Sequence, residues 1–118
     1  LETDVALSVN INLWNKALSN IIGNAVRHSP NSEDVYVYLL IDEKRKVLVI
    51  ENTGVFIQET DLENIFNPFY RVDKSRNKAT GGSGLGLYVV KTILDLHNMT
   101  YCIKNTQKGV AFFLYLDC

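Results

Sequence analysis

Residues 20–30 read NIIGNAVRHSP, a stretch that decides the fold because it joins the apolar face of a long helix to a row of polar side chains. Apolar residues recur at helical spacing between residues 13 and 27, which predicts a helix with one broad buried face. The residues that carry this spacing are Trp14, Ala17, Leu18, Ile21 and Ala25. Asparagines at positions 10 and 12 suit the start of the helix. The Ser29-Pro30 pair ends it, because proline disfavours helical geometry in the residue before it.

A polar stripe borders the buried face of this helix. Asn20, Asn24 and Arg27 stand at i, i+4 and i+7, and His28 falls at the edge of the stripe. Asparagine is a poor helix former, so two of them at a core boundary ask for a reason. An amide oxygen is a hard, neutral ligand that suits Mg²⁺ carried in by a polyphosphate. On the helix alone, solvated asparagines or asparagines bonded to backbone are an equal alternative.

Alternating apolar residues predict strands in the rest of the chain. These strands cover residues 4–9, 35–41, 47–51, 100–104 and 110–116. The charged turn at residues 42–46 joins two of them into a hairpin. Helices and strands are mixed, and the hairpins are too many for a purely parallel sheet.

Two further helices are expected. Residues 85–97 predict a long one, with Leu85, Val89, Ile93 and Leu96 on one face. Residues 60–65 predict a short one, with Thr60 as its cap and Glu63 completing a capping box.

The segment between these helices, residues 71–84, breaks every periodicity. A glycine-rich run, GSGLG at residues 82–86, leads into a helix. Four cations precede this run: Arg71, Lys74, Arg76 and Lys78. Glycines let backbone N–H groups approach phosphate, and a helix N-terminus favours anions. No Gly-Lys-Ser/Thr follows, as a Walker motif requires, and no strand precedes, as a dinucleotide fingerprint requires. The pattern predicts a mobile lid over phosphates, with a flexible linker as the alternative.

Asn52 ends a predicted strand and opens the turn at residues 52–54. An amide at that place is able both to donate to and to accept from a purine edge. The alternative is that Asn52 only shapes the turn, which is a common role of asparagine.

Bulk properties narrow the function classes. The 118 residues suit one domain, and the formal net charge of -1 gives no basic field that points to nucleic acid. Cys102 and Cys118 lie too far apart for a metal site or a disulfide framework. No run reaches the roughly 20 apolar residues of a membrane helix. The chain opens at Leu1 rather than Met, so we expect a part of a longer protein.

Taken in order, these motifs resemble the conserved boxes of histidine kinases. Residues 20–30 resemble the N box, 52–57 (NTGVFI) the first glycine box, 65–71 (IFNPFYR) the F box and 82–87 (GSGLGL) the second glycine box. The resemblance covers essentially the whole chain and is to the GHKL ATPase superfamily, shared with gyrase, Hsp90 and MutL. The Phe-Tyr-Arg run and the Gly-Leu-Gly-Leu ending favour the histidine kinase branch. Residues 51–54 and 86–91 are similar to the vancomycin-resistance sensor kinases.

The resemblance implies a Bergerat ATP-binding fold over residues 1–118, a two-layer α/β sandwich with a mixed sheet of about five strands and helices on one face. It implies the catalytic domain of a membrane-bound sensor histidine kinase, lying in the cytoplasm and making no membrane contact of its own. ATP and Mg²⁺ are the implied cofactors. The γ-phosphoryl group would pass to a histidine of a separate helical dimerisation domain, and the other partner would be a response regulator.

Rival interpretations are an anti-sigma-type serine kinase and a degenerate nucleotide-binding scaffold of the same fold. The acceptor histidine is not expected in this chain. His28 lies inside the N box, and His97 follows the second long helix without a dimerisation-helix pattern. We therefore expect both to be structural.

The resemblance also implies roles for single residues. Asn24 would bind Mg²⁺ through its side-chain oxygen, Asn20 would support the metal or the phosphates, and Arg71 would approach the γ-phosphate. The other implied nucleotide-binding residues are Arg27, His28, Asn52, Gly54, Ile57, Phe66, Arg76, Gly82, Gly84, Leu85 and Gly86. Two positions depart from the family pattern: Asn52 replaces an aspartate that accepts from the adenine amino group, and Phe56 replaces a second glycine. Adenine binding is expected to survive in weaker form.

Overall fold

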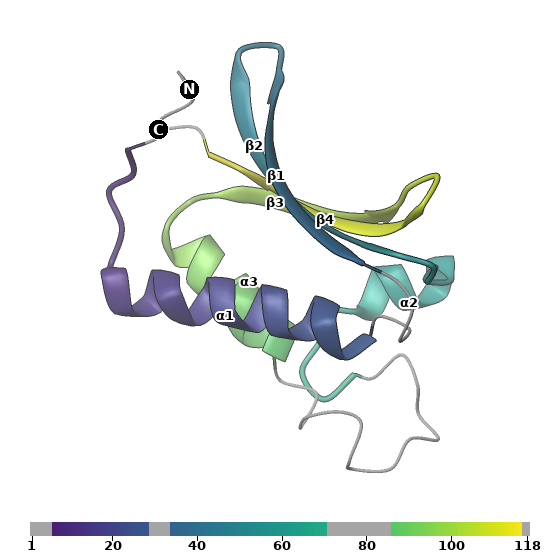
Figure 1. Ribbon diagram of the computed structural model, residues 1–118. Helices are drawn as coiled ribbons and strands as arrows, with labels where there is room; N and C mark the ends of the chain where they lie inside the picture. Colours follow the sequence, from purple (N-terminus) through teal and green to yellow (C-terminus); the bar gives the residue numbers. More distant parts are fainter. Residues whose placement is uncertain (1–5, 29–33, 71–85, 117–118) are drawn as a thin grey trace.

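The computed structural model describes residues 6–28, 34–70 and 86–116 as one layer of helices against one sheet (Figure 1). In chain order the elements are α1 (Ile11–His28), β1 (Val35–Asp42), β2 (Arg45–Thr53), α2 (Glu59–Asn64), α3 (Gly86–Leu96), β3 (Thr100–Asn105) and β4 (Gly109–Tyr115). Helices α1 and α3 pack side by side under the sheet, and α2 lies near its right-hand end in Figure 1. The expected two-layer α/β sandwich is confirmed.

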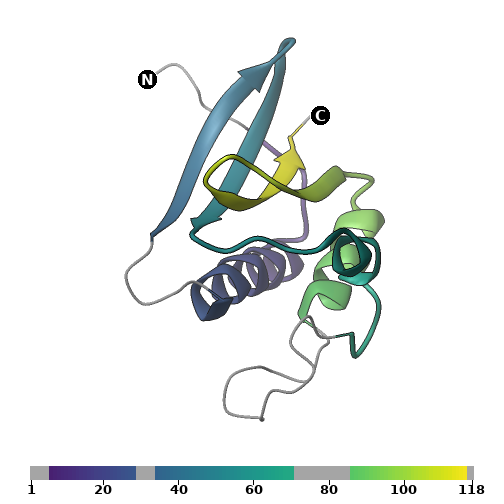
Figure 2. The same cartoon turned by 90° about the vertical axis from the view of Figure 1, so that its right-hand side faces the viewer.

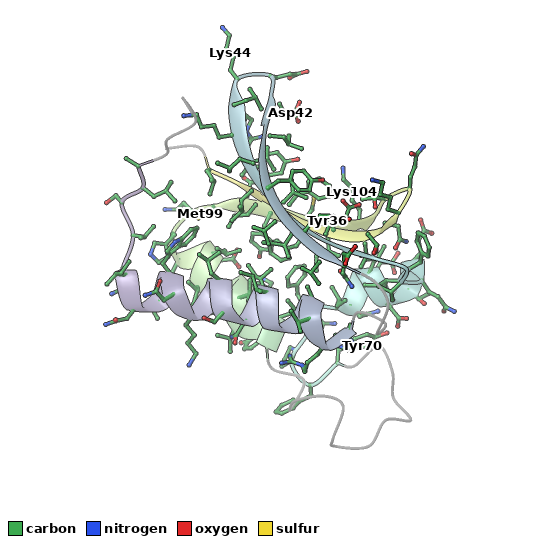
Figure 3. The ribbon with its side chains drawn as sticks, in the orientation of Figure 1. Tyr36, Asp42, Lys44, Tyr70, Met99 and Lys104 are labelled. Carbon is green, nitrogen blue, oxygen red and sulfur yellow. The ribbon has the colours of Figure 1, made fainter. Side chains whose placement is uncertain are left out.

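Within the described residues the sheet has four strands, in the order β1-β2-β4-β3, and every neighbouring pair is antiparallel. The β1–β2 hairpin turns through Glu43 and Lys44, whose φ angles of 49° and 75° suit a two-residue turn that follows the strand twist. Figure 2 shows this hairpin extending beyond the helices, and Figure 3 places Asp42 and Lys44 at its tip.

The main core lies between the helices and one face of the sheet. Residues of α1 (Ile21, Ala25), α3 (Leu87, Val90, Leu94) and the sheet (Ile50, Phe112, Leu114) meet there, all at most 8% exposed. Side chains alternate along a strand, so the odd-numbered residues of β2 point to the other face. There Val47, Val49 and Ala111 form a second, smaller cluster under Leu40, Phe113 and Tyr115.

Helix α1 begins as the sequence predicts. The Asn10 side chain accepts a hydrogen bond from Leu13 N–H at 3.1 Å, which caps the helix. His97 connects this start to the end of α3, because its Nε2 accepts from Asn10 N–H at 3.1 Å and its Nδ1 bonds to the Ile93 carbonyl at 2.8 Å. Both ring nitrogens of His97 are therefore occupied structurally, as expected for a histidine that is not the phosphate acceptor.

The strand expected at residues 4–9 is wrong for residues 6–9, which belong to no strand. The alternation that suggested it is real, because Leu7 and Val9 are half-buried while Ala6 and Ser8 are exposed. Leu7 is half-buried because it packs against the main core, and no ladder of strand hydrogen bonds is involved. Among the residues that the structure describes, the sheet consequently has four strands where about five were expected, and they are antiparallel rather than mixed.

Two local predictions for the helices are also wrong. Helix α2 begins at Glu59 after Gln58, with no side-chain cap, so Thr60 lies inside the helix and no capping box forms. In α3 the buried residues are Leu87, Val90, Ile93 and Leu94, whereas Leu96 is 67% exposed. The stripe is rotated because α3 packs against both α1 and the sheet, which a single row of apolar residues does not reveal.

Candidate nucleotide-binding site

The two N-box asparagines lie where the sequence placed them, at the border of the main core. Ala17, Ile21 and Ala25 form the buried stripe of α1, and Asn20 and Asn24 are half-buried beside it. Neither carboxamide has a hydrogen-bond partner within residues 6–28, 34–70 and 86–116. Arg27 and His28, one turn further on, are exposed. The alternative in which both asparagines bond to nearby backbone is therefore not what the structure contains.

Among the described residues of the predicted site, Asn52 is the most deeply buried polar side chain, at 5% exposed. It stands two residues after Ile50 on β2, so its side chain points to the same, helix-covered face of the sheet. In the described part of the chain its carboxamide has no hydrogen-bond partner. A buried amide without a partner costs about 1–3 kcal/mol, so a hydrogen bond to this side chain would be stabilising. The left-handed turn conformation belongs to Gly54, with φ 79°, and not to Asn52.

The loop after β2 carries Gly54 and Ile57, both predicted to contact nucleotide. Gly54 N–H donates to the Lys108 carbonyl at 2.9 Å, and Ile57 packs against the main core. Phe56, at the position of the family's second glycine, is 58% exposed and points away from the core. Its bulk is thus accommodated largely in solvent.

The F-box segment follows α2 and is held by aromatic packing. The Phe66 ring lies edge-on to Tyr101 (centroids 5.4 Å apart) and to Phe112 (6.2 Å). Tyr70, which Figure 3 places on the side of α2, donates its hydroxyl hydrogen to Asp61. This hydrogen bond to a carboxylate is the main cause that raises the pKa of Tyr70. Phe66 therefore acts first as a core anchor of this segment.

These elements meet at one end of the fold. Figure 1 shows the last turns of α1, the end of β2 and α2 on the same side of the molecule, and Figure 2 views that side directly. Gly86 is the first described residue of α3, next to the start predicted at residue 85 within the second glycine box. The predicted lid lies outside the described residues, and with it Arg71, Arg76, Gly82, Gly84 and Leu85.

Sequence reasoning missed four residues whose side chains support this end of the sheet. Glu51 is 8% exposed on the face away from the helices, and it accepts hydrogen bonds from Tyr38 (3.3 Å) and Thr106 (2.5 Å). Burial, and then the nearby Glu51 carboxylate, raise the pKa of Tyr38. Asn105 bonds to the backbone of Ile57. No local pattern marks these residues, because their partners lie 13 to 55 residues away in sequence.

Comparison with known proteins gives the class to which this fold and site belong. The family model of histidine kinase-, DNA gyrase B- and HSP90-like ATPases matches residues 10–118, and the chain belongs to this family. Within it, the chain is similar to sensor histidine kinases. Sensor protein VanSB of Enterococcus faecalis is 41% identical over 104 residues, which are 88% of this chain and 23% of that protein. The resemblance drawn from the four boxes is thereby confirmed.

Solved structures agree. Mycobacterial sensor histidine kinase MprB is 26% identical, with a TM-score of 0.77 over 91% of this chain and 73% of that one. Full-length ShkA in complex with AMPPNP has the same fold, with a TM-score of 0.66 at 23% identity over 87% of this chain and 20% of that one. The chain spans about a quarter of the length of its curated relative VanSB. It is an ATP-binding catalytic domain of the sensor histidine kinase type. In the described part of the chain, no helix has the length and apolar character to cross a membrane.

Proposed function

We propose that this domain binds Mg-ATP at the end of the fold where α1, β2 and α2 meet, and presents the γ-phosphoryl group to a histidine of a separate helical domain of its parent protein. The observation that carries the proposal is the set of three amides without partners in the described chain: Asn20, Asn24 and Asn52. All three border or enter the helix-covered side of the sheet.

The donor chemistry of these residues fits the groups of Mg-ATP. Asn24 and Asn20 offer neutral, half-buried oxygens, which suit a magnesium ion that keeps phosphate and water ligands. When bound, Mg²⁺ neutralises phosphate charge in phosphoryl transfer. Arg27, exposed about one turn after Asn24, adds a cation on the same stripe, and Arg71 and Arg76 are proposed to add theirs from the lid. Asn52 provides a buried acceptor for the base.

The chain's own contribution to the reaction is positioning and charge. No side chain of the described site is placed to form a covalent intermediate, and phosphoryl transfer requires little covalent work from the protein. The amides orient the nucleotide, and the buried strand end excludes water from the base. We further propose that the parent is a membrane-bound sensor whose kinase domain lies in the cytoplasm and whose phosphohistidine serves a response regulator.

Direct tests of this proposal use the isolated domain. Calorimetric titration with ATP in Mg²⁺ is expected to show binding that EDTA weakens. Incubated with labelled ATP, the domain alone is expected to carry no acid-labile phosphate, and the helical acceptor domain of its own parent, added in trans, is expected to become labelled. Acid-labile label on His28 or His97 of the isolated domain would contradict the proposal, and label on a serine would favour the serine kinase interpretation.

The base preference of the site depends on Asn52. An amide accepts from the adenine amino group without charge, and it can also turn to donate to the carbonyl that guanine has in that place. Hydrogen bonds to charged groups are worth about 1 kcal/mol more than neutral ones, so Asn52→Asp is expected to raise the ATP-over-GTP preference by about fivefold. Competition binding of ATP and GTP measures the ratio. Asn98→Asp, the same charge change at an exposed position after α3, is the control. An unchanged ratio in Asn52→Asp would remove Asn52 from the base site.

A further inference from the structure

The turn between β3 and β4 holds the end of β2 and the loop that follows it. Gly54 N–H donates to Lys108 O at 2.9 Å, and the Thr106 hydroxyl donates to the Glu51 carboxylate at 2.5 Å. The same hydroxyl oxygen accepts from Gly109 N–H at 3.1 Å, which keeps the turn itself closed. Residues 105–109, which we call the β3–β4 turn, therefore bond to the chain on both sides of Asn52, at Glu51 and at Gly54.

Asn105, the first residue of the β3–β4 turn, bonds to the loop further from Asn52. Its Oδ1 accepts from Ile57 N–H at 2.9 Å, and its Nδ2 donates to Ile57 O at 2.7 Å. One side chain thus satisfies both backbone groups of one residue, as a neighbouring strand would do. Ile57 is 48 residues away in sequence and lies after β2 has ended, in a stretch that belongs to no strand. The two bonds fix where the loop of residues 54–57 leaves the sheet.

We propose that Asn105 is a positioning residue for the base of the nucleotide: it does not touch the ligand but holds the loop of residues 54–57 in the conformation that binds it. The inference rests on the proposed function, which places the base against Asn52 and this loop. Without Asn105 the loop keeps the hydrogen bond from Gly54 N–H to the Lys108 carbonyl and the packing of Ile57. It loses the two hydrogen bonds that orient the Ile57 peptide. A preorganised loop avoids the ordering cost of binding, and a loosened one incurs it.

Substitutions separate the two halves of the contact. Asn105→Ala removes both bonds. Asn105→Asp keeps an acceptor for Ile57 N–H but places a carboxylate oxygen against the Ile57 carbonyl oxygen, where two acceptors repel each other, so it is also expected to loosen the loop. We expect Asn105→Ala to weaken ATP binding about fivefold to tenfold, corresponding to two modest hydrogen bonds. Because the phosphate contacts are untouched, the affinities for ATP, ADP and AMP should fall by the same factor.

Lys104→Ala is the matched control. It changes the preceding residue of β3, whose side chain lies on the opposite face of the sheet, with its Nζ 5.0 Å from the centroid of the Phe113 ring. Figure 3 labels this lysine at the sheet. Its removal is expected to leave the affinities for all three nucleotides unchanged.

The experiment combines nucleotide titration with amide hydrogen exchange in the absence of nucleotide. The inference is supported if Asn105→Ala and Asn105→Asp both speed exchange at Ile57 N–H and weaken the binding of all three nucleotides equally, while exchange in β2 stays slow. Wild-type nucleotide affinity in a variant that has lost protection at Ile57 would overturn it, as would a loss confined to ATP. Exchange that rises throughout the sheet would also overturn it, because Asn105 would then be stabilising the fold. If the unaltered domain binds no ATP, the proposed function fails as well. If the unaltered domain binds ATP and the Asn105 variants bind it equally well, only this inference fails.

Discussion

Replacing Asn24 with alanine is expected to weaken Mg-dependent ATP binding severely while leaving the domain folded. Asn24 is half-buried at the core border, and its carboxamide has no partner in the described chain, so its removal breaks no hydrogen bond among the described residues. Alanine is also the better helix former, so α1 is not weakened. Losing even a residue that only orients a metal ligand lowers metal affinity about 10–100-fold. A direct oxygen ligand stands at the upper end of this range, so we expect the affinity for Mg-ATP to fall roughly 100-fold.

Calorimetric titration with and without Mg²⁺ measures this loss, and urea unfolding checks the fold. Asn15→Ala is the control, because it makes the same substitution on the same helix at an exposed position away from the stripe. Equal affinities of Asn24→Ala and Asn15→Ala for Mg-ATP would show that the N-box stripe does not hold the metal.

The second large effect is expected at Gly109, the first residue of β4. A Cβ added there would lie 2.0 Å from the Asn52 carbonyl oxygen and 2.8 Å from Thr53 Cα, both backbone atoms that have no freedom to turn aside. Gly109→Ala must therefore push β4 away from the end of β2. Overpacking of this kind costs about 3 kcal/mol, so we expect that loss in the free energy of unfolding. The displaced Asn52 should lower ATP affinity in the protein that remains folded.

Gly23→Ala provides the opposite control with the same atoms added. In α1 the nearest neighbour of a new Cβ at Gly23 is the Arg27 side chain at 3.7 Å, which is an ordinary contact. Alanine is favoured over glycine inside a helix, so this variant should be more stable by about 0.5–1 kcal/mol. Denaturant unfolding of both variants gives the two free energies, and a stability of Gly109→Ala equal to that of the unaltered domain would refute the close-approach argument.

The site was predicted from sequence most fully where it lies on one continuous element. Asn20, Asn24 and the buried stripe of Ala17, Ile21 and Ala25 follow from helical periodicity, because residues three and four apart must share a face. The position of Asn52 at the end of a strand was also predicted. Its burial to 5% was not, because burial depends on what α1 and β4 place around it. Phe66 was assigned to nucleotide, whereas its first contacts are the rings of Tyr101 and Phe112.

By itself, the sequence determined the helices, the β1–β2 hairpin and the set of boxes, since these depend on periodicity and on residues close in the chain. Only the tertiary structure decided that β4 inserts between β2 and β3, and that the turn at residues 105–109 therefore meets the end of β2. It also decided that residues 6–9 pack without pairing, and that Asn105 bonds to Ile57 across 48 residues. The reason is physical: a strand's partner is selected by burying one whole face of the sheet at once, and that choice is spread over residues too far apart for any local pattern to record.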